Sequence, residues 1–394
     1  MRKLYLFNPD SDLALANNNE NYMSPEPARK IGADLALLPI WYADASALVL
    51  APSHPHAAYF QELAAKLDFC VELVSYPEID KLCTCKAYPW GWNLATRKQL
   101  IELGVQEKGL QSQNDIQKIR QLTHRKTSSK LLSLLPSHPL VCGVSEDVNS
   151  TEDLRSLAQQ LTNFLLKAPI SGSGKGLKWC RNGLDQASMK WFANTVEKQG
   201  SVLVEPIYSK VCDFAMEFEL LSPAEIRFIG YSSFVTNANG AYLGNQLLSD
   251  AALEQQLEDE FFVTGFLDQI RQELQGHILE IYGKDYQGYL GVDMMVCQDN
   301  ETSKFQLHPC VEINLRMNMG IVAHSVFNRY VQADKRGAYR INYTKKEGLL
   351  YQQHLQMQAQ HPLQISQGNK IVSGYLALCP VTPQSQYHAW ILIE

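Results

Sequence analysis

The chain has 394 residues, of which 45% are hydrophobic and 19% are charged, and its formal net charge is −6. This length predicts two or three domains with sizeable cores, and the composition excludes a globally disordered chain. The acidic balance also argues against a general nucleic-acid-binding protein, which normally carries a basic surplus.

The sequence contains no segment typical of membrane insertion or export. No stretch approaches eighteen consecutive apolar residues, and the opening MRKLYLFNPDSD has too few apolar residues for the core of a signal peptide. The nine cysteines are scattered, a pattern typical of a reducing compartment. We therefore expect a cytoplasmic protein with no membrane partner and no nucleic-acid partner.

Residues 1–111 are predicted to form an α/β domain. Short apolar strands are expected at 3–7, 47–52 and 71–76, with a helical pattern at 57–67. No glycine-rich dinucleotide fingerprint follows the first strand, so no nucleotide is assigned to this domain. Asp10 and Asp12 follow that strand, where open α/β sheets bind ligands. A ligand-docking site and a simple turn both remain open for these residues.

The central part of the chain alternates between helical and strand patterns. A helix or helix pair is expected at 114–136, and a capping box at Ser150 to Asp153 begins the next helix. The pattern at 250–283 predicts one long helix or two shorter ones. Strands are expected at 163–169, 201–208, 213–221, 225–236, 288–298 and 305–315, with further strands within 340–350 and 371–381.

A glycine-rich loop follows the strand FLLKAP. Gly172, Gly174 and Gly176 alternate with other residues, but the spacing does not match a Walker A loop, and the following GLKWCRNG predicts a strand where that loop would need a helix. Glycines in a strand–loop–strand hairpin let backbone amides approach phosphate oxygens. Lys167 lies inside the apolar strand, where a charge is costly unless it is paired. The functional interpretation is therefore a phosphate-binding hairpin, and the alternative is a flexible surface hairpin.

A second set of polar residues interrupts the two strands at 288–298 and 305–315. Glu312 and Asn314 lie two residues apart and share a strand face, and Asp293 can join them if the strands pair. Two carboxylates and an amide oxygen suit Mg²⁺, which takes its remaining ligands from water and nucleotide phosphates. Arg316 follows on the same face, and its planar guanidinium can donate several hydrogen bonds to a phosphate or carboxylate. An ion pair between these acids and Arg316 is the alternative interpretation.

The order of these motifs resembles the ATP-grasp superfamily over about residues 112–330. The segments that carry the resemblance are HRKTSSKLL, LLKAP, SGSGKG, VLVEP, GVDMM and EINLR. The resemblance implies a two-lobed ATP-grasp fold that holds ATP between α+β lobes, preceded by an α/β pre-grasp domain at residues 1–111. Residues 331–394 would then be a C-terminal extension that packs on the main body.

The resemblance also implies roles for individual residues. Lys167 would bind phosphate, and Arg316 would contact the transferred phosphoryl group or acyl phosphate. A basic residue on the first helix, Lys126 or Arg125, would also contact ATP, with Lys126 the choice made here. The metal ligands would be Asp293, Glu312 and Asn314. The other nucleotide contacts would be the flap Ser171, Gly172, Ser173, Gly174, Lys175 and Gly176, the hinge Glu205, Pro206 and Ile207, and Asp213 beside the ribose.

The expected activity is an ATP-dependent ligation that uses Mg²⁺ or Mn²⁺. A small carboxylate would be activated as an acyl phosphate and attacked by an amine, with release of ADP and phosphate. Attack by a thiol is the less favoured prediction. A phosphotransferase that acts on a hydroxyl and a nucleotide-binding module without turnover are the alternatives. The sequence identifies neither substrate, and it leaves open a homodimer and the role of residues 331–394.

Overall fold

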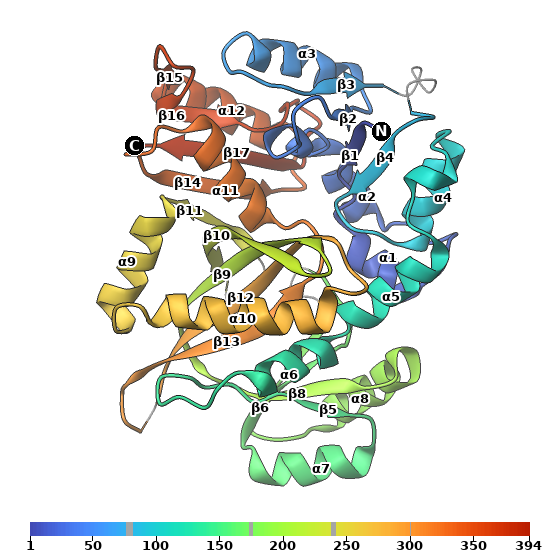
Figure 1. Cartoon of the computed structure of the whole chain (residues 1–394), viewed down its shortest axis with the longest axis vertical. Helices are drawn as coiled ribbons and strands as arrows, with labels where there is room; N and C mark the ends of the chain where they lie inside the picture. Colours follow the sequence, from blue (N-terminus) through green and yellow to red (C-terminus); the bar gives the residue numbers. More distant parts are fainter. Residues whose placement is uncertain (76–81, 173–175, 238–241, 300) are drawn as a thin grey trace.

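The computed structural model describes residues 1–75, 82–172, 176–237, 242–299 and 301–394. The described strands form three sheets, here called A, B and C. Sheet A lies in the N-terminal part of the chain, sheet C forms a small lobe at the bottom of the view, and sheet B runs from residue 209 to the C-terminal segment (Figure 1).

Sheet A is parallel, as predicted for the N-terminal domain. Its strand order is β3-β2-β1-β4, and the paired strands β1/β2, β1/β4 and β2/β3 all run parallel. The strands are β1 (Lys3–Leu6), β2 (Leu48–Leu50), β3 (Glu72–Val74) and β4 (Lys86–Pro89), and the helices of this region are α1 (Ser11–Asn17), α2 (Glu26–Asp34), η1 (Leu38–Trp41), α3 (His54–Ala64), α4 (Leu94–Glu102) and η3 (Glu107–Gly109). The chain leaves β1 towards β2 on one side and later returns as β4 on the other. The loops after β1 and β4 therefore lie at the switch point where such sheets bind ligands.

Sheet C is a four-stranded antiparallel sheet with two helices. It consists of β5 (Glu146–Val148), β6 (Asn163–Lys167), β7 (Leu177–Arg181) and β8 (Val202–Pro206) in the order β5-β8-β6-β7, with α7 (Thr151–Gln160) and α8 (Gln186–Gln199). Leu154 from α7 and Phe192 from α8 share its core with Phe164. The glycine loop thus joins the antiparallel neighbours β6 and β7, as the sequence predicts.

Sheet B contains nine strands in the order β13-β12-β9-β10-β11-β14-β17-β16-β15. Its strands are β9 (Ser209–Ser222), β10 (Glu225–Thr236), β11 (Tyr242–Leu247), β12 (Gly288–Gln298), β13 (Phe305–Asn314), β14 (Gly337–Tyr343), β15 (Gln364–Ile365), β16 (Ile371–Ala377) and β17 (Tyr387–Ile393). Its helices are α5 (Gln113–Thr123), α6 (Arg125–Leu134), α9 (Asp250–Phe261), α10 (Phe266–Tyr282), α11 (Met319–Tyr330) and α12 (Leu349–Gln360). Strands from beyond residue 330 therefore extend the same sheet, while the domain boundaries at 111 and 330 stay a prediction.

Two segments for which the sequence left either one helix or two open are helix pairs in the structure. The segment at 250–283 breaks between α9 and α10 at Gly265, whose φ of +84° suits glycine. Glu258 stabilises the break because its carboxylate accepts hydrogen bonds from the backbone N–H groups of Gly265 and Leu267, at 3.0 and 3.1 Å. The segment at 114–136 divides into α5 and α6, which share a core with sheet B.

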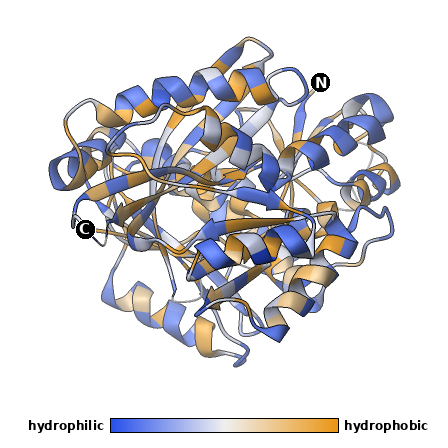
Figure 2. Ribbon diagram, turned by 90° about the horizontal axis from the view of Figure 1, so that it is seen from below, coloured by the Kyte–Doolittle hydropathy of each residue, from blue (hydrophilic) through white to orange (hydrophobic). Residues whose placement is uncertain are grey.

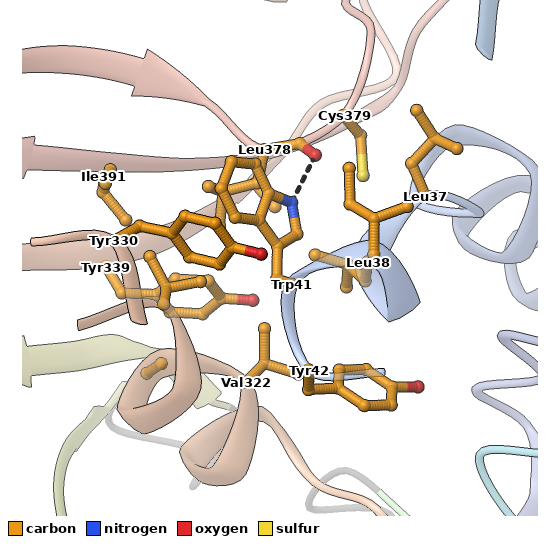
Figure 3. Close-up of a cluster of buried hydrophobic side chains, with 14 of the residues drawn as sticks. Leu37, Leu38, Trp41, Tyr42, Val322, Tyr330, Tyr339, Leu378, Cys379 and Ile391 are labelled. Atoms are coloured by element: carbon orange, nitrogen blue, oxygen red, sulfur yellow. Dashed lines mark hydrogen bonds between the residues drawn. The ribbon is translucent and has the colours of Figure 1, made fainter. Parts of the chain in front are cut away.

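The N-terminal domain and the C-terminal segment share one hydrophobic core. Trp41 is fully buried, and its indole N–H donates to the Leu378 carbonyl at 2.8 Å, while Tyr330 packs edge-on against it (Figure 3). Along the outer helices hydrophilic and hydrophobic residues alternate, as expected for helices that bury one face (Figure 2). Among the described residues, no helix is long and apolar enough to cross a membrane.

A buried polar group in the C-terminal segment predicts a pH dependence of stability. The Tyr375 hydroxyl hydrogen-bonds both His354 and His388 at 2.7 Å. Burial, reinforced by His354, lowers the pKa of His388 to about 3. Since an unfolded histidine has a pKa of about 6.5, the unfolded chain binds the proton first, and stability is lost as the pH falls from 6.5 towards 3.

We expect the free energy of unfolding to fall less between pH 7 and pH 5 in His388→Gln than in the unmodified protein, by about 2 kcal/mol. Chemical denaturation at both pH values measures the difference. The exposed His54 supplies the control, His54→Gln. Equal pH slopes for His388→Gln and the unmodified protein would contradict the expectation.

Candidate active site

The pairing of β12 with β13 brings the predicted metal ligands together. Asp293 lies directly opposite Glu312, and Gly291 lies opposite Asn314. The Asn314 amide donates to Asp293 Oδ2 at 3.0 Å. These three oxygen-bearing side chains, here called the acidic group, therefore lie together on the strand pair, at the positions that the period of the strands predicts.

The two carboxylates of this group differ in their titration. Burial, followed by the nearby charge of Glu312, raises the pKa of Asp293 to about 7. Burial alone would raise the pKa of Glu312 too, but Arg125 outweighs it, with help from Lys167 and Arg316, and holds that pKa below its ordinary value. Glu312 is therefore the carboxylate that stays ionised, and the group as a whole carries a negative charge that a cation can compensate.

Lys167 has the ion partner that its buried position requires. Its side chain is 5% exposed, and Nζ lies 2.5 Å from Glu205 Oε2 and donates to the Val311 carbonyl at 3.1 Å. Glu205, the predicted hinge residue on β8, also accepts a hydrogen bond from Ser145 at 3.0 Å. Because Val311 directly precedes Glu312, Lys167 reaches from sheet C to the strand that carries the acidic group.

Arg316 is held by a residue from the N-terminal domain. Its Nε donates to both carboxylate oxygens of Asp12 at 2.9 Å, and Nη2 lies 2.6 Å from Asp12 Oδ2. Nη2 also donates to Asn314 Oδ1 at 3.0 Å. This bidentate pair fixes the guanidinium beside the acidic group and brings Asp12 into the site. Asp12 therefore lies in the site and is more than a turn residue, but its carboxylate is paired with Arg316 and is not free to dock a ligand.

Arg125 is the basic residue of the first helices that reaches the site. Its Nη2 lies 2.5 Å from Glu312 Oε1, and Nη1 donates to Ser171 Oγ at 2.8 Å. Lys126, the residue chosen from the sequence, is exposed and lines a separate cavity of about 340 Å³ with Arg120 and His124. Arg125 and Lys126 are the first two residues of α6, so their side chains point in different directions. The sequence motif around them did not indicate which of the two faces the site.

The described ends of the glycine loop close the hairpin. Gly176 has a φ of +74°, and a Cβ there would lie 2.7 Å from the Ser171 Cβ. The Ala168 N–H donates to the Gly176 carbonyl at 2.8 Å, which extends the β6/β7 pairing. Gly172 lies next to the Asp12 carboxylate. The predicted flap residues Ser173, Gly174 and Lys175 lie outside the described residues.

One cavity of about 1230 Å³ connects these groups. Leu165 and Leu177 from sheet C and Met295 and Val311 from sheet B supply apolar side chains to its lining. The predicted hinge residues Pro206 and Ile207 border it as well. Asp213 lies in the wall, where its Oδ2 pairs with Lys210 at 2.5 Å and accepts from Thr236 at 3.0 Å.

Sequence reasoning missed several residues of this cavity. Glu217 on β9 and Asn318 before α11 line it, and the Asn318 amide donates to Glu217 at 2.7 Å. An acid in the apolar run DFAMEFELL was the available signal for Glu217. Nothing local marks Asn318, because its position depends on the packing of α11.

Comparisons with solved structures identify the fold. No protein-family model and no curated protein matches this sequence. N5-carboxyaminoimidazole synthetase from Staphylococcus aureus, complexed with ADP, superposes with a TM-score of 0.50 at 12% identity, over 100% of this chain and 93% of the other.

Two biotin carboxylases are also similar over 100% of this chain. The domain of Hydrogenobacter thermophilus 2-oxoglutarate carboxylase, with MgADP and bicarbonate, has a TM-score of 0.52 at 13% identity over 86% of its length. Campylobacter jejuni biotin carboxylase, in an ATP complex, has a TM-score of 0.52 at 11% identity over 87%. The chain therefore has the ATP-grasp fold with an N-terminal pre-grasp domain, which confirms the predicted fold class.

The two basic residues at the start of α6 give a paired test of the site. Arg125→Gln removes the side chain that joins Ser171 of the glycine loop to Glu312 of the acidic group. We expect the loss of this link to weaken the binding of Mg·ATP at least tenfold. Lys126→Gln, which changes an exposed neighbour, should alter that affinity less than twofold. Titration calorimetry measures both, and thermal unfolding checks that each variant is folded. A larger loss in Lys126→Gln than in Arg125→Gln would restore Lys126 as the nucleotide contact.

Proposed function

We propose that this protein is an ATP-dependent ligase that activates a small carboxylate as an acyl phosphate for attack by an amine. The observation that carries the proposal is the single cavity in which Asp293, Glu312 and Asn314 lie opposite the base of the glycine loop. Lys167, which bridges Glu205 and the Val311 carbonyl, ties the two sides of this cavity together.

The acidic group fits Mg²⁺ or Mn²⁺. The described residues contain no cluster of three or more His, Cys, Asp or Glu side chains arranged to bind a metal. The set here has two carboxylates and one amide, which suits an ion that takes its other ligands from phosphate and water. Burial, and after it the nearby charge of Glu312, raises the pKa of Asp293, and a bound cation would favour the ionised form of this carboxylate. Asp293, Glu312 and Asn314 would hold the ion.

The other end of the cavity fits a nucleotide. Leu165, Leu177, Met295 and Val311 supply apolar surface for a base, and the predicted hinge residues Pro206 and Ile207 border the same cavity. Ser171 and Gly172 begin the loop that would cover the phosphates. ATP bound with Mg²⁺ supplies the phosphoryl group that converts a carboxylate into an acyl phosphate with a good leaving group.

The chain's own residues would act through position and charge. Arg316, fixed by Asp12, directs its guanidinium beside Asn314, where a carboxylate or phosphoryl group could be held. Lys167 is buried next to the acidic strand, where it pairs with Glu205. Cys310 does not supply a nucleophile, because burial raises the pKa of its thiol and its sulfur hydrogen-bonds to the Ser128 carbonyl.

A C–N ligation is favoured over the other chemistries that the fold can host. The neighbours named above are a carboxyaminoimidazole synthetase and two biotin carboxylases, and one of them is complexed with MgADP and bicarbonate. Bicarbonate is therefore a candidate carboxylate for this chain, together with small organic acids. A cytoplasmic location fits these small-molecule substrates.

An ADP-release assay tests the proposal. Pools of amines would be combined with ATP, Mg²⁺ and either bicarbonate or small carboxylic acids. We expect ADP and phosphate to appear together only when both substrates are present, and Glu312→Ala to reduce the rate at least a hundredfold. Glu301→Ala, an exposed acid on the turn between β12 and β13, is the matched control and should keep the rate.

Three outcomes would contradict the proposal. ADP formation that depends on a hydroxyl compound and releases no phosphate would indicate a phosphotransferase. ATP binding without ADP formation in any pool would indicate a binding module. Activity that survives in Glu312→Ala would show that the metal site is misplaced.

A further inference from the structure

The cavity extends well beyond the nucleotide end. Its volume of about 1230 Å³ exceeds that of a pocket for a single small ligand. The part of the cavity away from the nucleotide end is bordered by loops of the N-terminal domain, by β9 and β10, and by the C-terminal segment. We call it the acceptor end and define it by Asp10, Ile31, Trp90, Glu217, Asn318 and Leu349.

Its walls come from elements that the fold holds firmly together. The loops after β1 and β4 meet at the switch point of sheet A, where the Asn8 amide donates to the Gly91 carbonyl at 2.7 Å. The C-terminal segment packs against the N-terminal domain through the core around Trp41 (Figure 3). Residues 331–394 therefore complete this end of the cavity.

The charges around the cavity do not suit an anionic acceptor. Among the described residues that line it, the cationic side chains are Lys167, Lys210 and Arg316. Each already has an acidic partner: Glu205, Asp213 and Asp12 respectively. The acceptor end adds two further acids, Asp10 and Glu217. Because the nucleotide phosphates and the activated carboxylate of the proposed reaction would already compete with these acids for the same cations, a phosphate or carboxylate on the acceptor would have no further described cation to pair with.

Glu217 lies in a preformed position at the cavity wall. It is 1% exposed, and its carboxylate lies between two glycines: a Cβ on Gly291 would come within 2.5 Å of Oε2 and a Cβ on Gly320 within 2.3 Å of Oε1. The Asn318 amide donates to Oε2 at 2.7 Å. Asn318 is itself fixed, because its Oδ1 caps α11 by accepting from the Ile321 N–H at 2.9 Å.

A buried carboxylate with no cation beside it is unfavourable. Burial raises the pKa of Glu217 to about 8, against the smaller effects of Asn318 and Arg316. Arg316 cannot serve as its ion partner, because its guanidinium is engaged by Asp12. A ligand that brings an ammonium or amine group to Glu217 would supply the missing partner.

We propose that the acceptor end binds an amine that carries no phosphate or carboxylate group, and that Glu217 is the specificity-determining residue that holds the amine nitrogen. The carbon body of the amine would contact Ile31, Trp90 and Leu349, which line the same end. This inference rests on the proposed function for the role of the amine as nucleophile.

Binding of matched probes to the full chain tests the inference without turnover. Isopentylamine and leucine share a carbon body but differ by one carboxylate, and ethanolamine and phosphoethanolamine differ by one phosphate. Ligand-observed NMR titrations would be run with Mg²⁺ and a non-hydrolysable ATP analogue. We expect each amine without the anionic group to bind at least tenfold more tightly than its partner.

Two carboxylates of β9 provide the variant and its control. Glu217→Gln, which can still accept from Asn318, should weaken isopentylamine binding at least tenfold and leave the affinity for the ATP analogue unchanged. Glu219→Gln changes an acid that pairs with Arg227 and does not line the cavity, so it should leave both affinities unchanged.

The inference would be overturned by a probe pair in which the anionic member binds equally well or better. Unchanged amine binding in Glu217→Gln, or no amine binding to the unmodified protein, would overturn it too. These outcomes are independent of ADP release, so intact amine binding without ligation would contradict only the proposed function.

Discussion

The antiparallel register between β12 and β13 is the constraint on which the site depends. It sets Asp293 opposite Glu312 and places Asn314 beside them. A slip of one residue would turn one strand's acid to the opposite face and separate the group. The register is supported on the other side of β12, where β9 pairs along the whole strand and places Glu217 opposite Gly291. The predicted metal site and the acceptor end are therefore fixed by the same three strands.

Charge pairing across domains holds the rest of the site around this sheet. Lys167 joins sheet C to the acidic strand, Arg125 joins α6 to Glu312, and Arg316 joins the sheet to Asp12 of the N-terminal domain. Removing one partner of such a buried pair leaves an uncompensated charge, which is costly. A bound metal or triphosphate would therefore have to exchange ion partners with these residues.

The sequence predicted the parts of the site that depend on local pattern. The period of two along EIN aligned Glu312 and Asn314, whereas Arg316 lies beyond the end of β13. The lysine in FLLKAP required a partner, which is Glu205. The fold class could be predicted because the motifs occur in a characteristic order. Contacts between distant segments could not: Asp12 and Arg316 are separated by 304 positions, and only the packing of the N-terminal domain on sheet B brings them together.

The same limit applies to the helices and to the C-terminal segment. Arg125 and Lys126 are adjacent, and only the way in which α6 packs on sheet B decides which side chain is buried. Strands β14 to β17 join sheet B through β11, a pairing between segments almost a hundred residues apart. The local pattern of 331–394 predicted strands but contained no information about the sheet that they extend.

The most direct test of the central claim is a crystal structure of the protein with Mn²⁺ and a non-hydrolysable ATP analogue, with the metal located by its anomalous scattering. The account predicts a metal peak in contact with Glu312 and Asp293, with the triphosphate between it and the loop that follows Lys167. A metal peak away from β12 and β13, or a nucleotide bound outside this cavity, would contradict it.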